Sequence, residues 1–433
     1  MRILKTTQTY YPYLSKGGPP AKVRAIARAL VRRGHEVTVL TADLGGGSAA
    51  DGRSRRQEEE SGAGGRRQGQ EAGGRKRSAR GWDSREDGVE AIYLRTVHNY
   101  RATTINPAIF GFCARRLRDF DVVHIYGLYD LFGSIAAWFC RRQGIPYVLE
   151  PLGMFGPKVR SQQKKRLYRK LVGNAVFEGA RVVIATSETE RMELIAGGIS
   201  EEKIVLRRNG IDLLEFQTLP AGGAFRARHK LDDSTPLILF LGRISFIKGL
   251  DLLIKAFAEV SQIHPQARLV IAGPDDADGC AEAIRKAVAE FQLGDRVILS
   301  GPLYGNERLE AFVDADIFVL PSRYESFGNV AAESIACGTP TLVTDECGIA
   351  PLIDGSAGLV VPCDVDGLRK GMKRLLEDED LLAQLRSGCA EVAKNLSWEE
   401  PVGAMEALYH SLVSEGRAPL LQTATKLAAD GRR

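Results

Sequence analysis

At residues 324–333 the chain reads Tyr324-Glu325-Ser326-Phe327-Gly328-Asn329-Val330-Ala331-Ala332-Glu333, separated by three residues from the preceding short apolar run 317–320. The apolar run predicts a buried strand, and the residues after Gly328 predict a helix that ends before Gly338-Thr339-Pro340. Glu325 then lies in the loop after a strand, whereas Glu333 lies inside the following helix. Gly328 is near the helix start, where unpaired backbone N–H groups and the helix dipole favour an anion. The stretch predicts an anion site flanked by two carboxylates.

A phosphate bound near Gly328 would have one carboxylate on each side, an arrangement that suits the sugar and the ribose of a nucleotide sugar. Two glutamates at this spacing alone would more often be a loop residue and a solvated helix residue. The complete pattern E-S-F-G-x-x-x-x-E, however, resembles the nucleotide-sugar motif of the retaining glycosyltransferase family 4. The resemblance implies a GT-B fold, in which two doubly wound Rossmann-like domains face each other across a cleft. It also implies that Glu325 and the amides of Phe327, Gly328 and Asn329 hold the sugar and phosphate, and that Glu333 binds ribose.

The length of 433 residues predicts two domains, because one compact core rarely grows so large. Hydrophobic residues make up 44% of the chain and charged residues 26%, as in soluble globular proteins. No apolar run approaches the roughly 18 residues that span a bilayer. The seven cysteines form no C-x-x-C pair and have no histidine at zinc spacing, so we expect reduced thiols, no bound metal and a cytoplasmic protein.

The formal charge of +5 comes mainly from residues 45–85, which carry ten Arg or Lys and six Asp or Glu. The remainder of the chain is nearly neutral, which argues against a nucleic-acid partner. Residues 45–85 are rich in Gly, Arg, Glu, Ser and Gln and hold one aromatic residue, Trp82. Such a composition cannot bury enough apolar surface to offset the entropy of ordering, so we expect a disordered insertion.

Apolar runs of strand length alternate with helical patterns in both halves of the chain, which predicts two α/β domains with parallel sheets. We expect an N-terminal, acceptor-side domain over residues 1–213, interrupted by the insertion. A nucleotide-sugar-binding domain over residues 214–396 follows. Residues 397–433 are expected to form a helix that crosses back to the N-terminal domain, with a frayed tail.

Two basic residues follow the predicted strand 237–241: Arg243 directly after it, and Lys248 before the next helix. Both side chains would leave one strand-to-helix loop at the carboxyl edge of the sheet. Fixed cations there can neutralise a diphosphate without a metal ion as charge develops on the leaving group. Alone they would read as ordinary loop cations, but the pattern G-R-x-x-x-x-K-G resembles the diphosphate clamp of family 4.

Gly17-Gly18 precedes a predicted helix that starts near Pro19. Glycine allows a backbone to approach a pyrophosphate, and this position resembles the donor-phosphate loop of family 4, so Gly18 is a candidate donor-binding residue. No G-x-G-x-x-G motif follows a strand, and we therefore expect no dinucleotide or other cofactor.

The strand 121–125 continues into Tyr126-Gly127-Leu128, where family 4 proteins often have H-x-H. His124 matches the first histidine and Tyr126 replaces the second, and strand alternation puts both side chains on one face. Tyr126 could donate a hydrogen bond to the sugar, but an ordinary pKa near 10 makes it a poor base. For His124 a hydrogen-bonded core histidine is as reasonable as a catalytic one.

Three further loops belong to the expected site. Glu150 and Gly153 end the next N-terminal strand and could shape an acceptor pocket, though a structural loop is equally reasonable. Gly301-Pro302-Leu303 matches the loop that holds the base in similar proteins, so Leu303 is a donor-binding candidate. The segment 158–170 holds seven basic residues and no acidic one. It is either a solvated basic face or a peripheral contact with an anionic membrane, on the inner face of the cell membrane.

The resemblance covers the chain except for residues 45–85 and implies a retaining, metal-independent hexosyltransferase. Its partners would be a nucleoside-diphosphate sugar and a hydroxyl acceptor on a glycan, a lipid-linked molecule or a small molecule, in polysaccharide or glycolipid biosynthesis. Two alternatives stay open. Tyr126 in place of histidine would fit a catalytically impaired nucleotide-sugar-binding or scaffold protein, and another GT-B enzyme, such as a nucleotide-sugar epimerase, would need a general base at the sugar ring.

Overall fold

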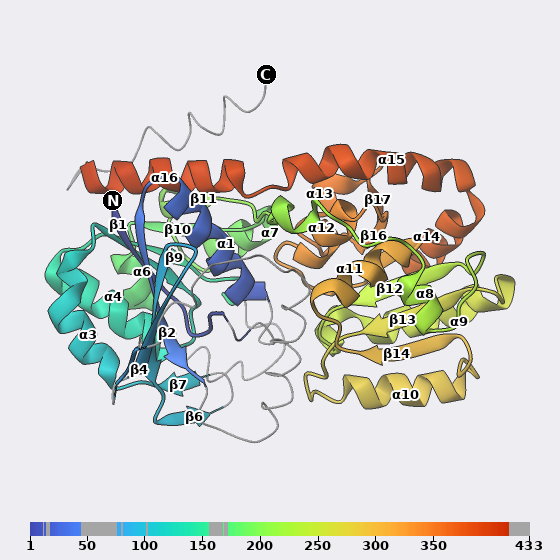
Figure 1. Ribbon diagram of the computed structural model, residues 1–433, viewed down its shortest axis with the longest axis horizontal. Coiled ribbons are helices and arrows are strands. Elements are labelled where there is room, and N and C mark those ends of the chain that lie inside the picture. Colours follow the sequence, from blue (N-terminus) through green and yellow to red (C-terminus); the bar gives the residue numbers. More distant parts are fainter. Residues whose placement is uncertain are drawn as a thin grey trace. The chain divides into compact units, whose positions relative to one another are not determined.

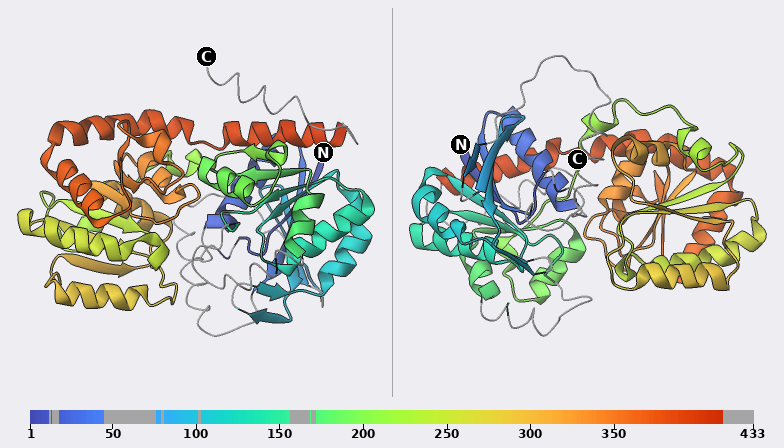
Figure 2. Two further views of the ribbon diagram at one scale, coloured as in Figure 1. Left: turned by 180° about the vertical axis from the view of Figure 1, so that it is seen from behind. Right: turned by 60° about the horizontal axis from the view of Figure 1, so that its bottom comes forward.

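The computed structural model describes residues 1–11, 13, 18–44, 76–78, 81–100, 103–155, 168 and 172–414. The described residues form two compact units. The first unit comes from the ranges Met1–Ser48, Gly69–Asn209 and Trp398–Arg433, and the second includes Gly210–Ser397. Each unit is an α/β layer structure with helices on both faces of a sheet (Figures 1 and 2).

The sheet of the first unit has the strand order β11-β10-β9-β8-β1-β2-β5-β4-β3. Its pairs are parallel from β11 to β5 and antiparallel from β5 to β3. The strands are β1 (Arg2–Thr6), β2 (Glu36–Asp43), β3 (Lys76–Ser78), β4 (Gly81–Glu86), β5 (Val89–Arg95), β8 (Val122–Tyr126), β9 (Tyr147–Glu150), β10 (Val182–Ala185) and β11 (Ile204–Leu206). A separate hairpin pairs β6 (His98–Tyr100) with β7 (Thr103–Ile105).

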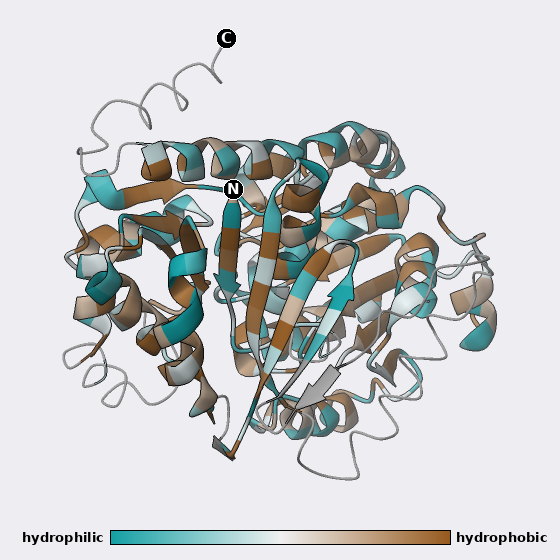
Figure 3. Ribbon diagram, turned by 60° about the vertical axis from the view of Figure 1, so that its left-hand side comes forward, coloured by the Kyte–Doolittle hydropathy of each residue, from teal (hydrophilic) through white to brown (hydrophobic). Residues whose placement is uncertain are grey.

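The helices of the first unit cover this sheet: α1 (Gly18–Arg32), α3 (Ala108–Arg116), α4 (Leu131–Gln143), α6 (Asn174–Gly179), α7 (Glu188–Ala196) and α16 (Glu399–Ser414). The last of these, α16, packs against α1 and β8. The central parallel strands are hydrophobic along most of their length, as expected for a sheet buried on both faces (Figure 3).

The second unit has a fully parallel sheet in the order β14-β13-β12-β15-β16-β17. Its strands are β12 (Leu237–Leu241), β13 (Arg268–Ala272), β14 (Val297–Gly301), β15 (Ile317–Leu320), β16 (Thr341–Thr344) and β17 (Gly358–Val361). Its helices are α8 (Ala224–Arg228), α9 (Leu250–Ile263), α10 (Cys280–Glu290), α11 (Gly305–Asp314), α12 (Asn329–Ala336), α13 (Ala350–Ile353), α14 (Val365–Glu377) and α15 (Glu379–Asn395). Successive strands are added on one side of β12 as far as β14, and from β15 onward they are added on its other side. This switch point is where open α/β sheets bind ligands.

The prediction of disorder over residues 45–85 is wrong for its last part. β4 pairs antiparallel with β5, with Trp82 opposite Tyr93, and β3 pairs with β4. The turn between β4 and β5 is Asp87-Gly88, with φ of +53° and +79°. An Asp-Gly pair between two strands is a strong hairpin signal. This pair lies just after residue 85, and the composition of residues 45–85 concealed the strand that precedes it.

None of the helices that the structure describes combines the length and the apolarity needed to cross a bilayer. The basic segment 158–170 lies outside the described residues apart from Tyr168, so its expected membrane contact stays a prediction.

Candidate active site

The candidate donor site lies at the carboxyl ends of β12 and β15, which are neighbouring parallel strands. Lys248 ends a short 3₁₀ turn, Phe246–Lys248, in the loop after β12. Glu325 lies in the loop after β15, and its carboxylate forms an ion pair with the Lys248 ammonium. Both side chains are mostly buried. The structure therefore brings together two residues that are 77 positions apart in the sequence.

Two features lock these loops together. Gly249 has a φ of +67°, and a Cβ there would lie 1.8 Å from the carbonyl oxygen of Pro321, so only glycine allows this close approach. Arg323 donates to the Phe246 carbonyl oxygen at 2.7 Å and forms a bidentate ion pair with Asp251 at 2.6 and 2.7 Å. Arg323 was not predicted as a site residue. It is a positioning residue for the loop that carries Lys248.

Arg243 leaves the same loop but has a different partner. Its Nη1 lies 2.9 Å from Oδ1 of Asp276, which follows β13, and 46% of the Arg243 side chain is exposed. Arg243 and Lys248 thus lie at the carboxyl edge of the sheet, as the spacing predicts. Each cation is neutralised by a carboxylate that an incoming diphosphate could replace.

The loop after Glu325 leads directly into α12. Glu325 pairs with Cys347 in an isolated parallel bridge, and the Phe327 carbonyl oxygen accepts a hydrogen bond from the Ile349 amide at 2.7 Å. The Phe327 side chain is buried in the core, so only its backbone can serve a ligand. Gly328 caps the helix with a φ of +110°, and Asn329 is the first helical residue. Strand β15, this loop and helix α12 form the strand–loop–helix unit predicted for residues 317–336.

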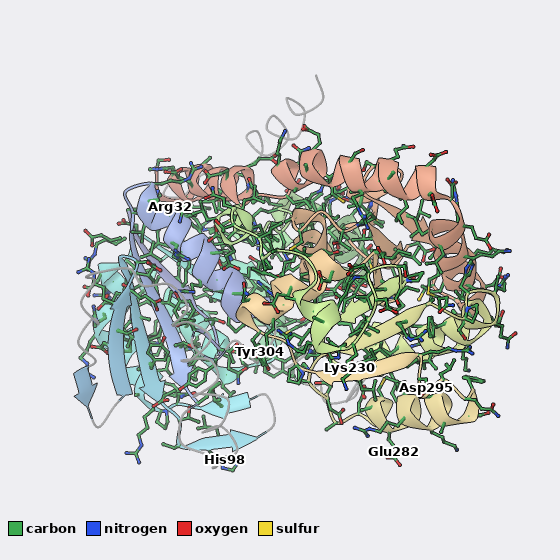
Figure 4. The ribbon with its side chains drawn as sticks, turned by 45° about the vertical axis from the view of Figure 1, so that its right-hand side comes forward. Arg32, His98, Lys230, Glu282, Asp295 and Tyr304 are labelled. Atoms are coloured by element: carbon green, nitrogen blue, oxygen red, sulfur yellow. The ribbon has the colours of Figure 1, made fainter. Side chains whose placement is uncertain are left out.

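Glu333 lies on α12 and forms an ion pair with Arg308 of α11, with 3.0 Å between Oε2 and Nη1. Burial raises the pKa of the Glu333 carboxyl above its ordinary value, and the Arg308 guanidinium acts to lower it. Arg308 also contacts Glu215 at 3.4 Å. The helix that carries Arg308 begins after Tyr304, which is labelled in Figure 4. Arg308 was missed, because an arginine on a helix gives no sequence signal of its partner.

The remaining donor candidates lie at loop ends. Gly18 is the first residue of α1 and is exposed, while residue 17 lies outside the described part of the chain. Gly301 ends β14 with a φ of +78°, and Leu303 packs partly against the core of the second unit. Within the described part of the chain, no contact of Gly18 or Leu303 bears on these two roles, which stay predictions.

His124 and Tyr126 lie side by side in the core of the first unit, their rings stacked with centroids 4.1 Å apart. His124 Nδ1 lies 2.6 Å from the hydroxyl of Tyr409 on α16, and Tyr126 accepts a hydrogen bond from Lys5 at 2.9 Å. Burial lowers the pKa of His124 to about 3 and raises that of Tyr126 well above 10. The alternation prediction is correct, but the contacts match the core-histidine interpretation. A catalytic role would require the side chain of His124 or Tyr126 to reach a bound sugar, and both side chains are buried here.

The structure places Glu150 in the core of the first unit. Its carboxylate is fully buried and forms ion pairs with Lys22 of α1 and with Arg207. The distance between Oε2 of Glu150 and Nη2 of Arg207 is 2.8 Å. Burial acts to raise the pKa of Glu150, but the Arg207 and Lys22 cations together lower it below its ordinary value. Glu150 therefore joins β9, α1 and the end of β11 and exposes no atom to an acceptor. The nearby Gly153 donates its amide to Oε1 of Glu190 at 2.6 Å, also a structural contact.

Lys5, the buried lysine that donates a hydrogen bond to Tyr126, leads to a prediction about pH. Burial, with the Arg207 cation, lowers the pKa of Lys5 to about 7, far below the 10.5 of an exposed lysine. Between pH 7 and 8.5 the unfolded chain therefore binds more protons than the folded one, and the free energy of unfolding rises with pH. One such group contributes at most about 1.4 kcal/mol per pH unit. Burial also lowers the pKa of Lys22, to about 8, so Lys5→Met should reduce this rise in urea denaturation without abolishing it. Parallel pH profiles of the two proteins would contradict the placement of Lys5.

Comparisons with known proteins agree with this architecture. Residues 17–210 match the family model of the glycosyl transferase 4-like domain, and residues 223–394 match that of glycosyl transferases group 1. The D-inositol 3-phosphate glycosyltransferase 1 of Catenulispora acidiphila is 30% identical over 328 residues, which are 72% of this chain and 78% of the relative. The D-inositol 3-phosphate glycosyltransferase of Kineococcus radiotolerans is 29% identical over 322 residues, 70% and 74% of the two chains.

Two solved structures are similar in fold. The sucrose-phosphate synthase of Thermosynechococcus elongatus has a TM-score of 0.70 and 24% identity, with 96% of this chain and 99% of that chain covered. Anabaena HepE in complex with UDP and glucose has a TM-score of 0.70 and 19% identity, with 95% and 100% covered.

Proposed function

Because this chain belongs to glycosyltransferase family 4 and has the GT-B fold, we propose that it transfers a sugar from a nucleoside-diphosphate sugar to a hydroxyl acceptor with retention of the anomeric configuration. The observation that carries this proposal is the joining of Lys248, Glu325 and the start of α12 at the switch point between β12 and β15. A cation, a carboxylate and a helix N-terminus at one point suit a phosphate with a sugar attached.

In this proposal Arg243 and Lys248 stabilise the departing diphosphate, so the transfer needs no metal ion. Glu325 and the amides of residues 327–329 hold the transferred sugar and its phosphate, and Glu333 accepts hydrogen bonds from the ribose hydroxyls. Gly18 and Leu303 would contact the donor phosphate and the base. Arg308 is a positioning residue, because its ion pair orients the Glu333 carboxylate.

The named relatives suggest where to begin with substrates. Two of them are D-inositol 3-phosphate glycosyltransferases, which motivates a polyol phosphate among the first acceptors to be tried. The UDP in the HepE complex motivates UDP-sugars as the first donors. The catalytically impaired alternative rests on Tyr126 alone, and the intact set of two cations and two carboxylates weighs against it.

A thermal-shift screen of the chain with UDP, GDP, ADP and their sugar conjugates, all in EDTA, tests the proposal without a known acceptor. A ligand at about 100 times its Kd that binds only the folded chain stabilises it by about 2.7 kcal/mol. We expect one nucleotide to raise the melting temperature in EDTA. No shift with any nucleotide would contradict the proposed donor site, and a shift only with added divalent metal would contradict metal independence. Once an acceptor is found, a product with inverted anomeric configuration would contradict retention.

A further inference from the structure

Helices α3 and α4 of the first unit lie against each other (Figure 1). Both present large apolar side chains to solvent. Phe110 on α3 is 53% exposed, and Trp138 and Leu131 on α4 are 52% and 42% exposed. Isolated exposed apolar residues are common and need no explanation, whereas a contiguous group indicates an interaction site.

These side chains are contiguous. The Phe110 ring contacts Phe139 edge-on with 6.4 Å between centroids, and Phe139 contacts Trp138 at 4.8 Å. The Arg142 guanidinium carbon lies 5.5 Å from the Trp138 ring centroid. Leu131 precedes Trp138 by seven residues, two helical turns, and so lies on the same face of α4. Phe110, Leu131, Trp138 and Phe139 therefore form one aromatic ridge across two helices.

The surroundings of this aromatic ridge are basic. Helices α3 and α4 contain four arginines and no acidic residue: Arg115, Arg116, Arg141 and Arg142. Arg116 has an acidic partner, Asp119, at the long distance of 3.8 Å. Arg115 and Arg141 donate hydrogen bonds to the backbone carbonyl oxygens of Gly111 and Ala175, and both side chains are exposed. The ridge is thus bordered by positive charge.

We propose that this aromatic ridge and its arginines bind the surface of an anionic lipid bilayer. Trp and Phe prefer the interface between headgroups and acyl chains, while Arg142 beside Trp138 and the neighbouring arginines attract anionic headgroups. Charge complementarity disfavours a second copy of this face, because both copies would bring a net positive charge to the contact. The ridge consists of described residues, and Tyr168, the described residue of the segment 158–170, hydrogen-bonds Ser134 in the first turns of the adjoining helix α4.

Vesicle co-sedimentation of the full chain tests this inference. We expect binding to vesicles of phosphatidylcholine with about 30% phosphatidylglycerol, weaker binding at high salt, and little binding to phosphatidylcholine alone. The double variant Phe110→Ala/Trp138→Ala should bind at least tenfold more weakly, and so should Arg141→Gln/Arg142→Gln, because these arginines follow Trp138 by three and four residues on one face of α4. Because these side chains are exposed, their removal should leave the melting temperature nearly unchanged.

Matched controls come from exposed residues of the second unit. Ile263→Ala/Phe291→Ala removes apolar side chains that are comparably exposed, and Arg285→Gln/Lys286→Gln removes two charges from α10; both should bind like the wild type. Equal binding to neutral and anionic vesicles would overturn the proposal, as would wild-type binding by both ridge variants. A wild-type dimer that Trp138→Ala dissociates, without vesicle binding, would instead identify an interface between copies. The assay needs neither donor nor acceptor, so its failure is separate from a failure of the proposed transfer.

Discussion

Lys248→Ala is expected to lower kcat by about 10²- to 10³-fold, the cost of removing one fixed charge-stabilising group from a transition state. Lys248 lies beside Glu325 at the carboxyl end of β12, where negative charge would develop on the departing diphosphate. Since this interaction strengthens only as the sugar–phosphate bond breaks, the affinity for donor should change far less than kcat. Steady-state kinetics with a donor from the nucleotide screen measure both quantities.

The matched control for this variant is Lys255→Ala, because Lys255 is an exposed lysine on the adjacent helix α9. Its kcat should equal that of the wild type. If Lys248 served only as a counter-ion for Glu325, Lys248→Ala would lower thermal stability and leave kcat within about twofold. That result would remove Lys248 from the catalytic machinery.

Glu150→Gln is expected to destabilise the first unit by about 3–5 kcal/mol, the usual effect of removing one partner from a buried ion pair. The substitution keeps the shape of the side chain but leaves Lys22 and Arg207 buried without their shared carboxylate. A loss of this size is a large part of the stability of an ordinary domain, so the variant should unfold at a much lower urea concentration.

Glu178→Gln is the control, because Glu178 is an exposed glutamate at the end of α6 and should tolerate the change. The comparison also separates the two interpretations of Glu150. A variant with normal stability and an increased KM for acceptor would restore the acceptor-pocket role expected from the sequence. Loss of stability as expected would support the structural role.

The sequence predicts the second unit in detail because each local signal there agrees with the fold. The apolar run before Tyr324, the glycine at 328 and the stop at Gly338 define β15, the loop and α12 with little ambiguity. The G-R-x-x-x-x-K-G pattern likewise locates Arg243 and Lys248 at the sheet edge. Their partners could not be predicted, because Asp276 and Arg308 come from other loops and helices, and pairing across a sheet depends on tertiary packing.

The first unit was harder to predict for a physical reason. Strand ends locate His124, Tyr126 and Glu150, but a sequence does not tell whether a strand-end side chain points to solvent or into the core. A signal was present in Lys5, a lysine that follows the apolar residues Ile3 and Leu4 in the first strand, all three of them buried. In a parallel sheet covered on both faces, such a residue must be buried, and a buried cation needs polar partners on the neighbouring strands.

Glu333 on α12 is expected to bind the donor ribose, and isothermal titration of UDP, GDP and ADP into the wild type and Glu333→Ala tests the donor site most directly. Loss of a charged hydrogen-bond acceptor costs about 1.5–3 kcal/mol, so the Kd of the preferred nucleotide should rise by roughly 10- to 100-fold. The control Glu282→Ala removes an exposed glutamate on α10, labelled in Figure 4, and should bind like the wild type. Equal affinities of the wild type and a folded Glu333→Ala would contradict the donor site at α12.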